Sequence, residues 1–282
     1  MSRVRIAIAV LACLFASAAP AAPVVVEAVQ YPAWLERGGQ SVPLVPGVEL
    51  QGADRLRTGT NARARLRFPD GSTVKLGENA RFELERVQDV GFLRASLRMV
   101  GGAFRYTTDK LRLSARRSVT IRAHNVTVGI RGTDLWGKSS EEKEIVCLIE
   151  GAVTVGSEGH PAVTLDQPLD FYQLPRGGSP TVAKVDPKQI EKWALETDTQ
   201  TDAPVAQAGG QWRVIAAMPD TRDAALALGR SLRSQGYPAR AEGGSAGPHA
   251  VVIAGLAGEA EARALLRNIA SVPGVANPSI AN

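Results

Sequence analysis

Hydrophobic and polar positions alternate with a period of two along much of the first 174 residues. The clearest case is Ala62–Phe68, where small or apolar residues alternate with arginines. That period gives a strand with one buried and one wet face. Asp70-Gly71 follows, and an Asp-Gly pair between two such runs predicts a hairpin with Thr73–Leu76. Turns recur about every 8–12 positions, the spacing of a sandwich, barrel or solenoid. We expect residues 24–174 to form an all-β domain, solenoid- or sandwich-like.

The pattern changes after residue 174. Asp186-Pro187 predicts the start of a helix, because Asp caps a helix N-terminus well and Pro fits the first position. One short helix should then run from Lys188 to Glu196. Residues 197–210 are small, polar and punctuated by Pro and Gly, which predicts a flexible linker. We therefore expect residues 175–210 to be a short helix and a linker that separate two domains.

The last stretch, residues 211–282, mixes strand-like and helix-like patterns. Strands are expected at 212–217, 238–241, 249–254 and 276–280, and helices at 221–235 and 259–269. The order βαββαβ is the split-βαβ plan, in which both helices cover one face of a small sheet. The sequence therefore predicts a multidomain chain, with an all-β domain followed by a small α+β domain.

The N-terminus has the form of a secretory signal peptide. Arg3 and Arg5 precede an apolar run that ends at Phe15, and Ala19-Pro20-Ala21 offers a cleavage site. The run is shorter than the roughly 20 residues that span a bilayer, and no later segment is long and apolar enough to do so. We expect residues 1–21 to be a signal peptide and the mature protein to be periplasmic. The apolar stretch before Cys13 is very short for a lipoprotein signal, so no lipid anchor is expected.

Composition and charge narrow the class of protein. Hydrophobic residues make up 44% and charged residues 22%, which excludes a collagen-like, coiled-coil or wholly disordered chain. The formal net charge is +5 and falls to +3 without the two leader arginines. A basic balance raises the question of nucleic acid, but aromatic residues are only 5% and no nucleic-acid motif is present, so no such partner is expected. Arg63, Arg65 and Arg67 should share one strand face. This stripe is either a solvated surface or one that attracts anionic envelope polymers.

Candidate chemistry is sparse. The three histidines, His124, His160 and His249, have no metal-type spacing to one another or to Cys, so neither a metal nor a cofactor is expected. There is no nucleophile elbow and no phosphate loop. Asp134 is typical of a turn residue that binds nearby backbone rather than of a catalytic acid. We expect no catalytic residues and no enzymatic activity. Cys147 lies in an apolar run and is expected to be a small buried hydrophobe.

Several motifs of the first domain, in order along the chain, resemble a FecR-type domain. They are DRLRTG at 54–59, LRFPDGSTVKL at 66–76, GAFR at 102–105, VGIRGTDL at 128–135 and EGAV at 150–153. The resemblance implies an exported all-β domain in which Arg131–Asp134 is a fold signature. Known members include cell-surface signalling regulators that act on sigma factors. Those regulators carry a cytoplasmic helical domain and a transmembrane helix, where this chain has the signal peptide instead.

The second domain, residues 211–282, is similar to a SPOR domain. The matching residues are WRVIAAM at 212–218, Asp223-Ala224, Leu232, Gly236-Tyr237, VVIAGL at 251–256 and Glu259-Ala260. The resemblance implies the βαββαβ fold and binding of peptidoglycan glycan strands that lack stem peptides. The sequence departs from the family where polar strand residues are common, because Val214 and Ala216 are apolar.

Strand alternation puts Trp212, Val214 and Ala216 on one face. By the family register this is the face away from the helices, beside Ala250 and Val252. The candidates for contacting glycan are the aromatic platform and three nearby donors: Trp212, Arg213, Arg240 and His249. We expect a non-enzymatic envelope protein that binds peptidoglycan glycan strands through the SPOR-like domain and presents the FecR-type domain to a ligand or protein. The alternative is a periplasmic signalling or scaffold adaptor whose SPOR-like sheet binds another envelope protein.

Overall fold

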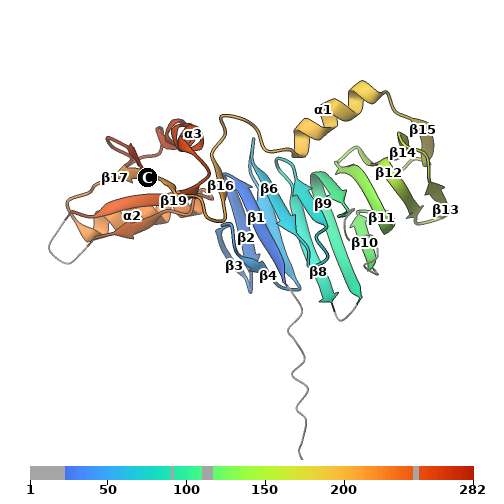
Figure 1. Ribbon diagram of the computed structural model, residues 1–282, viewed down its shortest axis with the longest axis horizontal. Helices are drawn as coiled ribbons and strands as arrows, with labels where there is room; N and C mark the ends of the chain where they lie inside the picture. The colour runs from blue at the N-terminus through green and yellow to red at the C-terminus, as the bar shows by residue number, and fades with distance from the viewer. Residues whose placement is uncertain (1–22, 90–91, 110–116, 244–247) are drawn as a thin grey trace, which may run out of the picture.

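A computed structural model describes residues 23–89, 92–109, 117–243 and 248–282, and shows a mostly β protein with three helices (Figure 1). The leader with Cys13 lies outside the described residues. So do residues 110–116, where the sequence predicts a short strand at Leu111–Ser114. No helix in these described ranges is long and apolar enough to cross a membrane.

The strands before the first helix form two sheets. The first sheet has the order β1(Val24–Gln30), β6(Arg63–Arg67), β7(Thr73–Leu76), β9(Leu93–Thr107), β11(Val126–Ser139), β12(Lys143–Ser157), β14(Asp170–Pro175), β15(Thr181–Lys184), with β4(Glu49–Leu50) also on β1. The second has the order β3(Gln40–Pro43), β2(Ala33–Arg37), β5(Asp54–Thr58), β8(Arg81–Asp89), β9, β10(Arg117–Ala123), β11, β12, β13(His160–Leu165). The expected all-β domain is therefore present, in a sandwich-like form.

Three long strands, β9, β11 and β12, belong to both sheets and bend from one into the other. Gly102, Gly132 and Gly151 lie at the bends. Gly151 has φ +90°, and a Cβ there would stand 2.3 Å from the carbonyl oxygen of Gly132. Only glycine allows this close approach of two backbones. The sequence pattern predicts two strands here, at 145–150 and 152–155, but the structure has one bent strand, β12.

Period-two burial fills the space between the sheets. In β10, Val119, Ile121 and Ala123 are buried and the residues between them are partly or fully exposed. The same alternation in the first sheet buries Leu66 on β6 and Phe104 on β9. These residues belong to one continuous hydrophobic core. Such a core is expected when two sheets, each with one solvent-exposed face, pack their other faces together.

The segment after β15 crosses the outside of the first sheet. Helix α1(Pro187–Thr197) begins as expected, with the Asp186 carboxylate accepting a hydrogen bond from the backbone N–H of Lys188. The expectation of a flexible linker at 197–210 was wrong. Strand β16(Val205–Gln207) pairs with β1 on one side and with β19(Ala250–Leu256) on the other, and Ala203 and Ala206 are buried. Long-range pairing of this kind leaves no local signal in a small, polar sequence.

The C-terminal part has the expected order βαββαβ: β17(Trp212–Ala217), α2(Arg222–Ser234), β18(Arg240–Glu242), β19, α3(Glu259–Ile269), β20(Ser279–Ala281). The strands lie in the order β18, β19, β17, β20. The prediction of which side chains of β17 face away from the helices was wrong. Val214 and Ala216 are fully buried in the core that also holds Leu228 and Leu265 of the helices, whereas Ile215 is partly exposed. The helices therefore cover the face that was expected to be open.

The two parts meet along β1–β16–β19 and at a second contact near β2 (Figure 1). The indole N–H of Trp34 donates to the carbonyl of Ser234, and the rings of Tyr31 and Tyr237 lie 6.3 Å apart. A Cβ on Gly236 would stand 2.8 Å from the Trp34 ring, so this turn is pressed against the β domain. Backbone pairing and side-chain packing thus fix the C-terminal part on the β domain.

Candidate functional site

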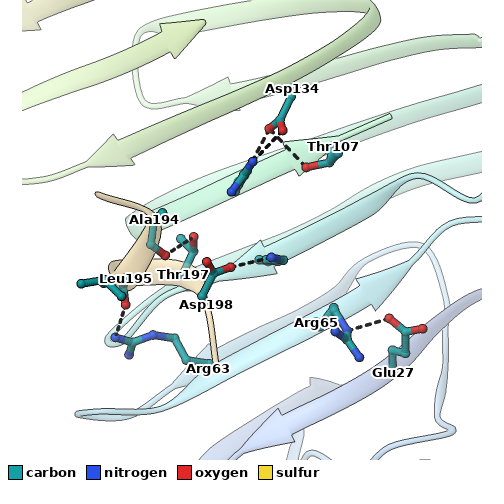
Figure 2. Close-up of polar contacts among 11 residues, drawn as sticks. Glu27, Arg63, Arg65, Thr107, Asp134, Ala194, Leu195, Thr197 and Asp198 are labelled. Atoms are coloured by element: carbon teal, nitrogen blue, oxygen red, sulfur yellow. Dashed lines mark hydrogen bonds and ion pairs between the residues drawn. The ribbon is translucent and has the colours of Figure 1, made fainter. Parts of the chain in front are cut away.

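The outer face of the first sheet carries polar contacts between residues that are far apart in the chain (Figure 2). Strand register places three cationic side chains side by side on β6, β7 and β9: Arg65, Lys75 and Arg105. Cations directly opposite one another repel, so the arrangement needs anions from elsewhere in the chain.

Each of the three cations pairs with a different carboxylate. Arg65 pairs with Glu27 of β1, with 2.7 Å between Nε and Oε2. Lys75 pairs with Asp198, which follows α1. Arg105 donates two hydrogen bonds to Asp134 of β11, at 2.9 and 2.6 Å (Figure 2). Each cation of the row is therefore paired within the chain.

Asp134 is not the turn residue bound to nearby backbone that the sequence predicts, because it lies within β11 and its carboxylate binds side chains. Its carboxylate accepts from Arg105 and also from the Thr107 hydroxyl at 3.2 Å. The hydrogen bond with Asp134 raises the pKa of the Arg105 guanidinium. The neighbouring Thr133 hydroxyl donates to the carbonyl of Ala152 at 2.9 Å, across the bend where β11 and β12 change sheets. Thr133 therefore helps to hold the bend.

Helix α1 covers part of this face. The Trp193 ring stacks on Trp136 of β11 with centroids 4.4 Å apart and an interplanar angle of 2°. Lys138 pairs with Glu196 at 2.8 Å, so both apolar and ionic contacts attach the helix. Trp136 is 1% exposed and lies in a small second core with Ala103 and Ile145.

The expected basic stripe is not a free surface. Arg63 is only 4% exposed, and its guanidinium donates to the carbonyls of Ala62 and Leu195. Burial lowers its pKa. Arg65 and Arg67 both pair with Glu27. The sequence could show that these residues share a face but not that their partners lie on β1 and on α1.

The outer face of the second sheet has a different arrangement. One register row runs across five strands as Glu36, Arg55, Glu83, Arg98, Arg122. Arg98 and Arg122 both bind Glu85, and Arg55 lies 3.5 Å from Glu83. The arginines of these pairs are exposed, and ion pairs with an exposed partner contribute little to stability.

The four glycan-binding candidates of the C-terminal part do not form one group. Arg213 and Arg240 approach the same carboxylate, Glu242, at 3.9 and 2.7 Å. Trp212 is partly buried, packs on the hydrophobic core and pairs with the buried Leu256. His249 precedes β19 and is partly buried. The expected combination of an open aromatic platform with two free arginines is not what the structure shows.

Two other titratable side chains are Cys147 and His160. Cys147 is fully buried, as expected, and burial raises the pKa of its thiol to about 12, which leaves it protonated and unreactive near neutral pH. His160 contacts the carbonyl of Glu158 at 3.1 Å. Within the described ranges, no three His, Cys, Asp or Glu side chains lie together as metal ligands would.

Comparison with known proteins identifies the class of the first domain. Residues 54–154 match the family model described as FecR protein, so the chain carries a FecR-type domain there and this part of the resemblance is confirmed. The match ends before the C-terminal part, for which the SPOR resemblance stays a prediction. No curated protein matches the chain.

Two similar solved structures are both described as a "putative anti-sigma factor" from Parabacteroides distasonis. One is 15% identical with a TM-score of 0.42, over 50% of this chain and 64% of that chain. The other is 14% identical with a TM-score of 0.42, over 78% of this chain and 91% of that chain. In the first comparison the shared region therefore spans less than two thirds of the solved chain.

Proposed function

We propose that this chain is a non-enzymatic signalling or scaffold adaptor of the bacterial envelope, exported by its N-terminal segment, whose FecR-type domain binds a protein partner. The observation that carries the proposal is the FecR match at residues 54–154. The outer face of the first sheet supports it, because the ion pairs there connect strands and α1 and so hold the fold together.

The C-terminal part serves this adaptor as a rigid extension. Strand β16 pairs with both β1 and β19, and Trp34 donates to the carbonyl of Ser234. A partner that binds one part therefore meets a surface whose orientation to the other part is fixed. A flexible tether would leave the two parts to bind independently.

A second candidate function is binding of peptidoglycan glycan strands by the C-terminal part. The observation that favours it is the βαββαβ order, which is the fold implied by the SPOR resemblance. The ion pairs of Arg213 and Arg240 with Glu242 favour the adaptor instead, because a sugar would have to compete with that carboxylate.

Photo-crosslinking in intact cells tests the adaptor. A photoreactive residue is placed at Thr154, exposed on the second sheet, at Val182, exposed on β15, or at the buried Val155 as a matched control. We expect one discrete crosslinked protein from an exposed position, confirmed by reciprocal tagging, and none from Val155. Absence of any protein crosslink from both exposed positions would contradict the proposal.

Sedimentation with purified sacculi separates the two candidates. The adaptor predicts no enrichment on amidase-treated sacculi that depends on Trp212 or Arg240. Enrichment that is lost in both Trp212→Ala and Arg240→Gln, with Arg263→Gln on α3 as a control, would establish the glycan-binding candidate instead.

A further inference from the structure

A hollow of about 600 Å³ opens where the β domain meets the C-terminal part. Strands β2, β5 and β8 provide one wall through Trp34, Arg57 and Arg81, and α3 provides Asn268. Clefts between two packed parts of a chain are frequent ligand sites. This hollow is separate from the first-sheet face and from the four residues proposed for glycan binding.

The hollow has an excess of positive charge. Arg57 and Arg81 lie directly opposite each other on β5 and β8. Like charges in that position destabilise a sheet, because the side chains start only about 5 Å apart. Glu36 lies 3.6 Å from Arg57, whereas Arg81 is exposed and forms no ion pair with any residue in the described ranges. One guanidinium therefore lacks the counter-charge that the first-sheet cations have.

Trp34 holds the other guanidinium in place. The Arg57 guanidinium carbon lies 3.9 Å from the centre of the indole ring, a cation–π contact. The ring itself is fixed by its hydrogen bond to Ser234 and by Gly236. Arg57 is thus preorganised beside Arg81, and a guanidinium pair of this kind suits a carboxylate or phosphate that it can bind through two hydrogen bonds.

Neutral hydrogen-bonding groups line the rest of the hollow. Asn61, Asn79 and Asn268 are exposed, and their side-chain amides make no hydrogen bond to any part of the chain that the structure describes. A carboxamide both donates and accepts, which matches the hydroxyl groups of a sugar. Asn61 and Asn79 occupy turns with φ +56° and +51°, so their positions are set by the backbone.

We propose that this junction hollow binds an anionic saccharide, with Arg57 and Arg81 on the acidic group and the three asparagines on the hydroxyls. The inference goes beyond the proposed adaptor function. A ligand that contacts β5, β8 and α3 together stabilises the contact between the two parts, because binding to one assembled state favours that state. The acidic group is a carboxylate or a phosphate, and the test separates these two sources.

Calorimetric titration of the full chain tests the site with four probes: a galacturonate trisaccharide, a phosphorylated glucosamine disaccharide, neutral maltotriose and inorganic phosphate. We expect at least one anionic saccharide to bind more tightly than maltotriose and inorganic phosphate. Arg81→Gln should weaken that binding about tenfold, since a charged hydrogen bond is removed. Arg86→Gln is the matched control, because Arg86 is also an exposed arginine of β8 but does not line the hollow.

Asn268→Ala provides a second variant that leaves both arginines in place. It should weaken saccharide binding several-fold and leave any binding of inorganic phosphate unchanged. The proposal is overturned if neither anionic saccharide binds, if maltotriose binds equally well, if inorganic phosphate accounts for all binding, or if Arg86→Gln has the same effect as Arg81→Gln. Each of these failures leaves protein-partner binding by the FecR-type domain standing.

Discussion

The outer faces of the two sheets carry similar arginine-rich strands, but the cations on the two faces differ in their carboxylate partners. On the first sheet Arg65, Lys75 and Arg105 each have a separate carboxylate, and α1 covers the neighbouring surface. On the second sheet Arg57 and Arg81 face each other, and only Arg57 has a carboxylate, Glu36, beside it among the described residues. Carboxylates from distant segments can pair with the cations of a basic strand. Such a strand therefore indicates a binding surface only when the partners of its cations are known.

The largest expected effect comes from removing the apolar contact that covers the first sheet. Trp136→Ala should lower the free energy of unfolding by about 3–5 kcal/mol, because Trp136 is 1% exposed and no water can fill its place favourably. Urea unfolding measures it. Trp193→Ala is the control, and its loss should be smaller, since Trp193 is only partly buried. Equal losses would contradict the expected effect of the different burial of the two rings, and a loss below about 1 kcal/mol for Trp136→Ala would show that the fold does not depend on this contact.

The second largest effect should be a difference in the stability cost of removing a carboxylate from each of the two outer faces. Asp134→Asn on the first sheet should cost about 1.5–3 kcal/mol, because it weakens two charged hydrogen bonds from the half-buried Arg105. The matched change on the second sheet, Glu83→Gln, should cost about 0–1 kcal/mol, because its partner Arg55 is largely exposed. Chemical unfolding of both variants checks the pair. A larger loss for Glu83→Gln would reverse the comparison.

A smaller effect should appear in the pH dependence of stability. Glu85 on the second sheet is partly buried, which opposes its charge, but hydrogen bonds from Arg98 and Arg122 outweigh this and lower its pKa. Its stabilisation is complete above its unfolded pKa and is lost as the pH falls through the folded value. Glu144 on β12 behaves oppositely, because burial raises its pKa, so the fold loses stability as the pH rises above the unfolded value.

Unfolding of Glu85→Gln and Glu144→Gln between about pH 3 and about pH 7 measures these contributions. The difference from the wild type should grow with pH in both variants, as a loss of stability for Glu85→Gln and as a relative gain for Glu144→Gln. The same sign for both variants would contradict the assigned environments.

Local patterns predicted the elements of this fold well. The alternation of apolar and polar residues predicted the β6–β7 hairpin. The N-cap signal Asp186-Pro187 predicted the start of α1. The structure also confirms the βαββαβ order and the bounds of α3. These features depend on neighbours within a few residues, which a sequence shows directly.

Sequence patterns did not predict the features that depend on residues far apart in the chain. The pairing of β16 with β1 joins residues more than 170 positions apart, and nothing in the segment 197–210 indicates it. In β17, Val214 and Ile215 are both apolar, so alternation alone does not tell which face the helices cover. The partners of Arg63 and Arg65 also lie far from them in sequence, and Arg81 and Asn268, which line the same hollow, come from opposite ends of the chain.

The most direct test of the contrast between the two faces is the affinity of the galacturonate trisaccharide and the phosphorylated glucosamine disaccharide for Arg81→Gln and Arg65→Gln. The account predicts about a tenfold loss for Arg81→Gln with the anionic saccharide that binds, and no change for Arg65→Gln, whose charge is already paired with Glu27. A loss in Arg65→Gln as large as in Arg81→Gln, or wild-type affinity in Arg81→Gln, would contradict it.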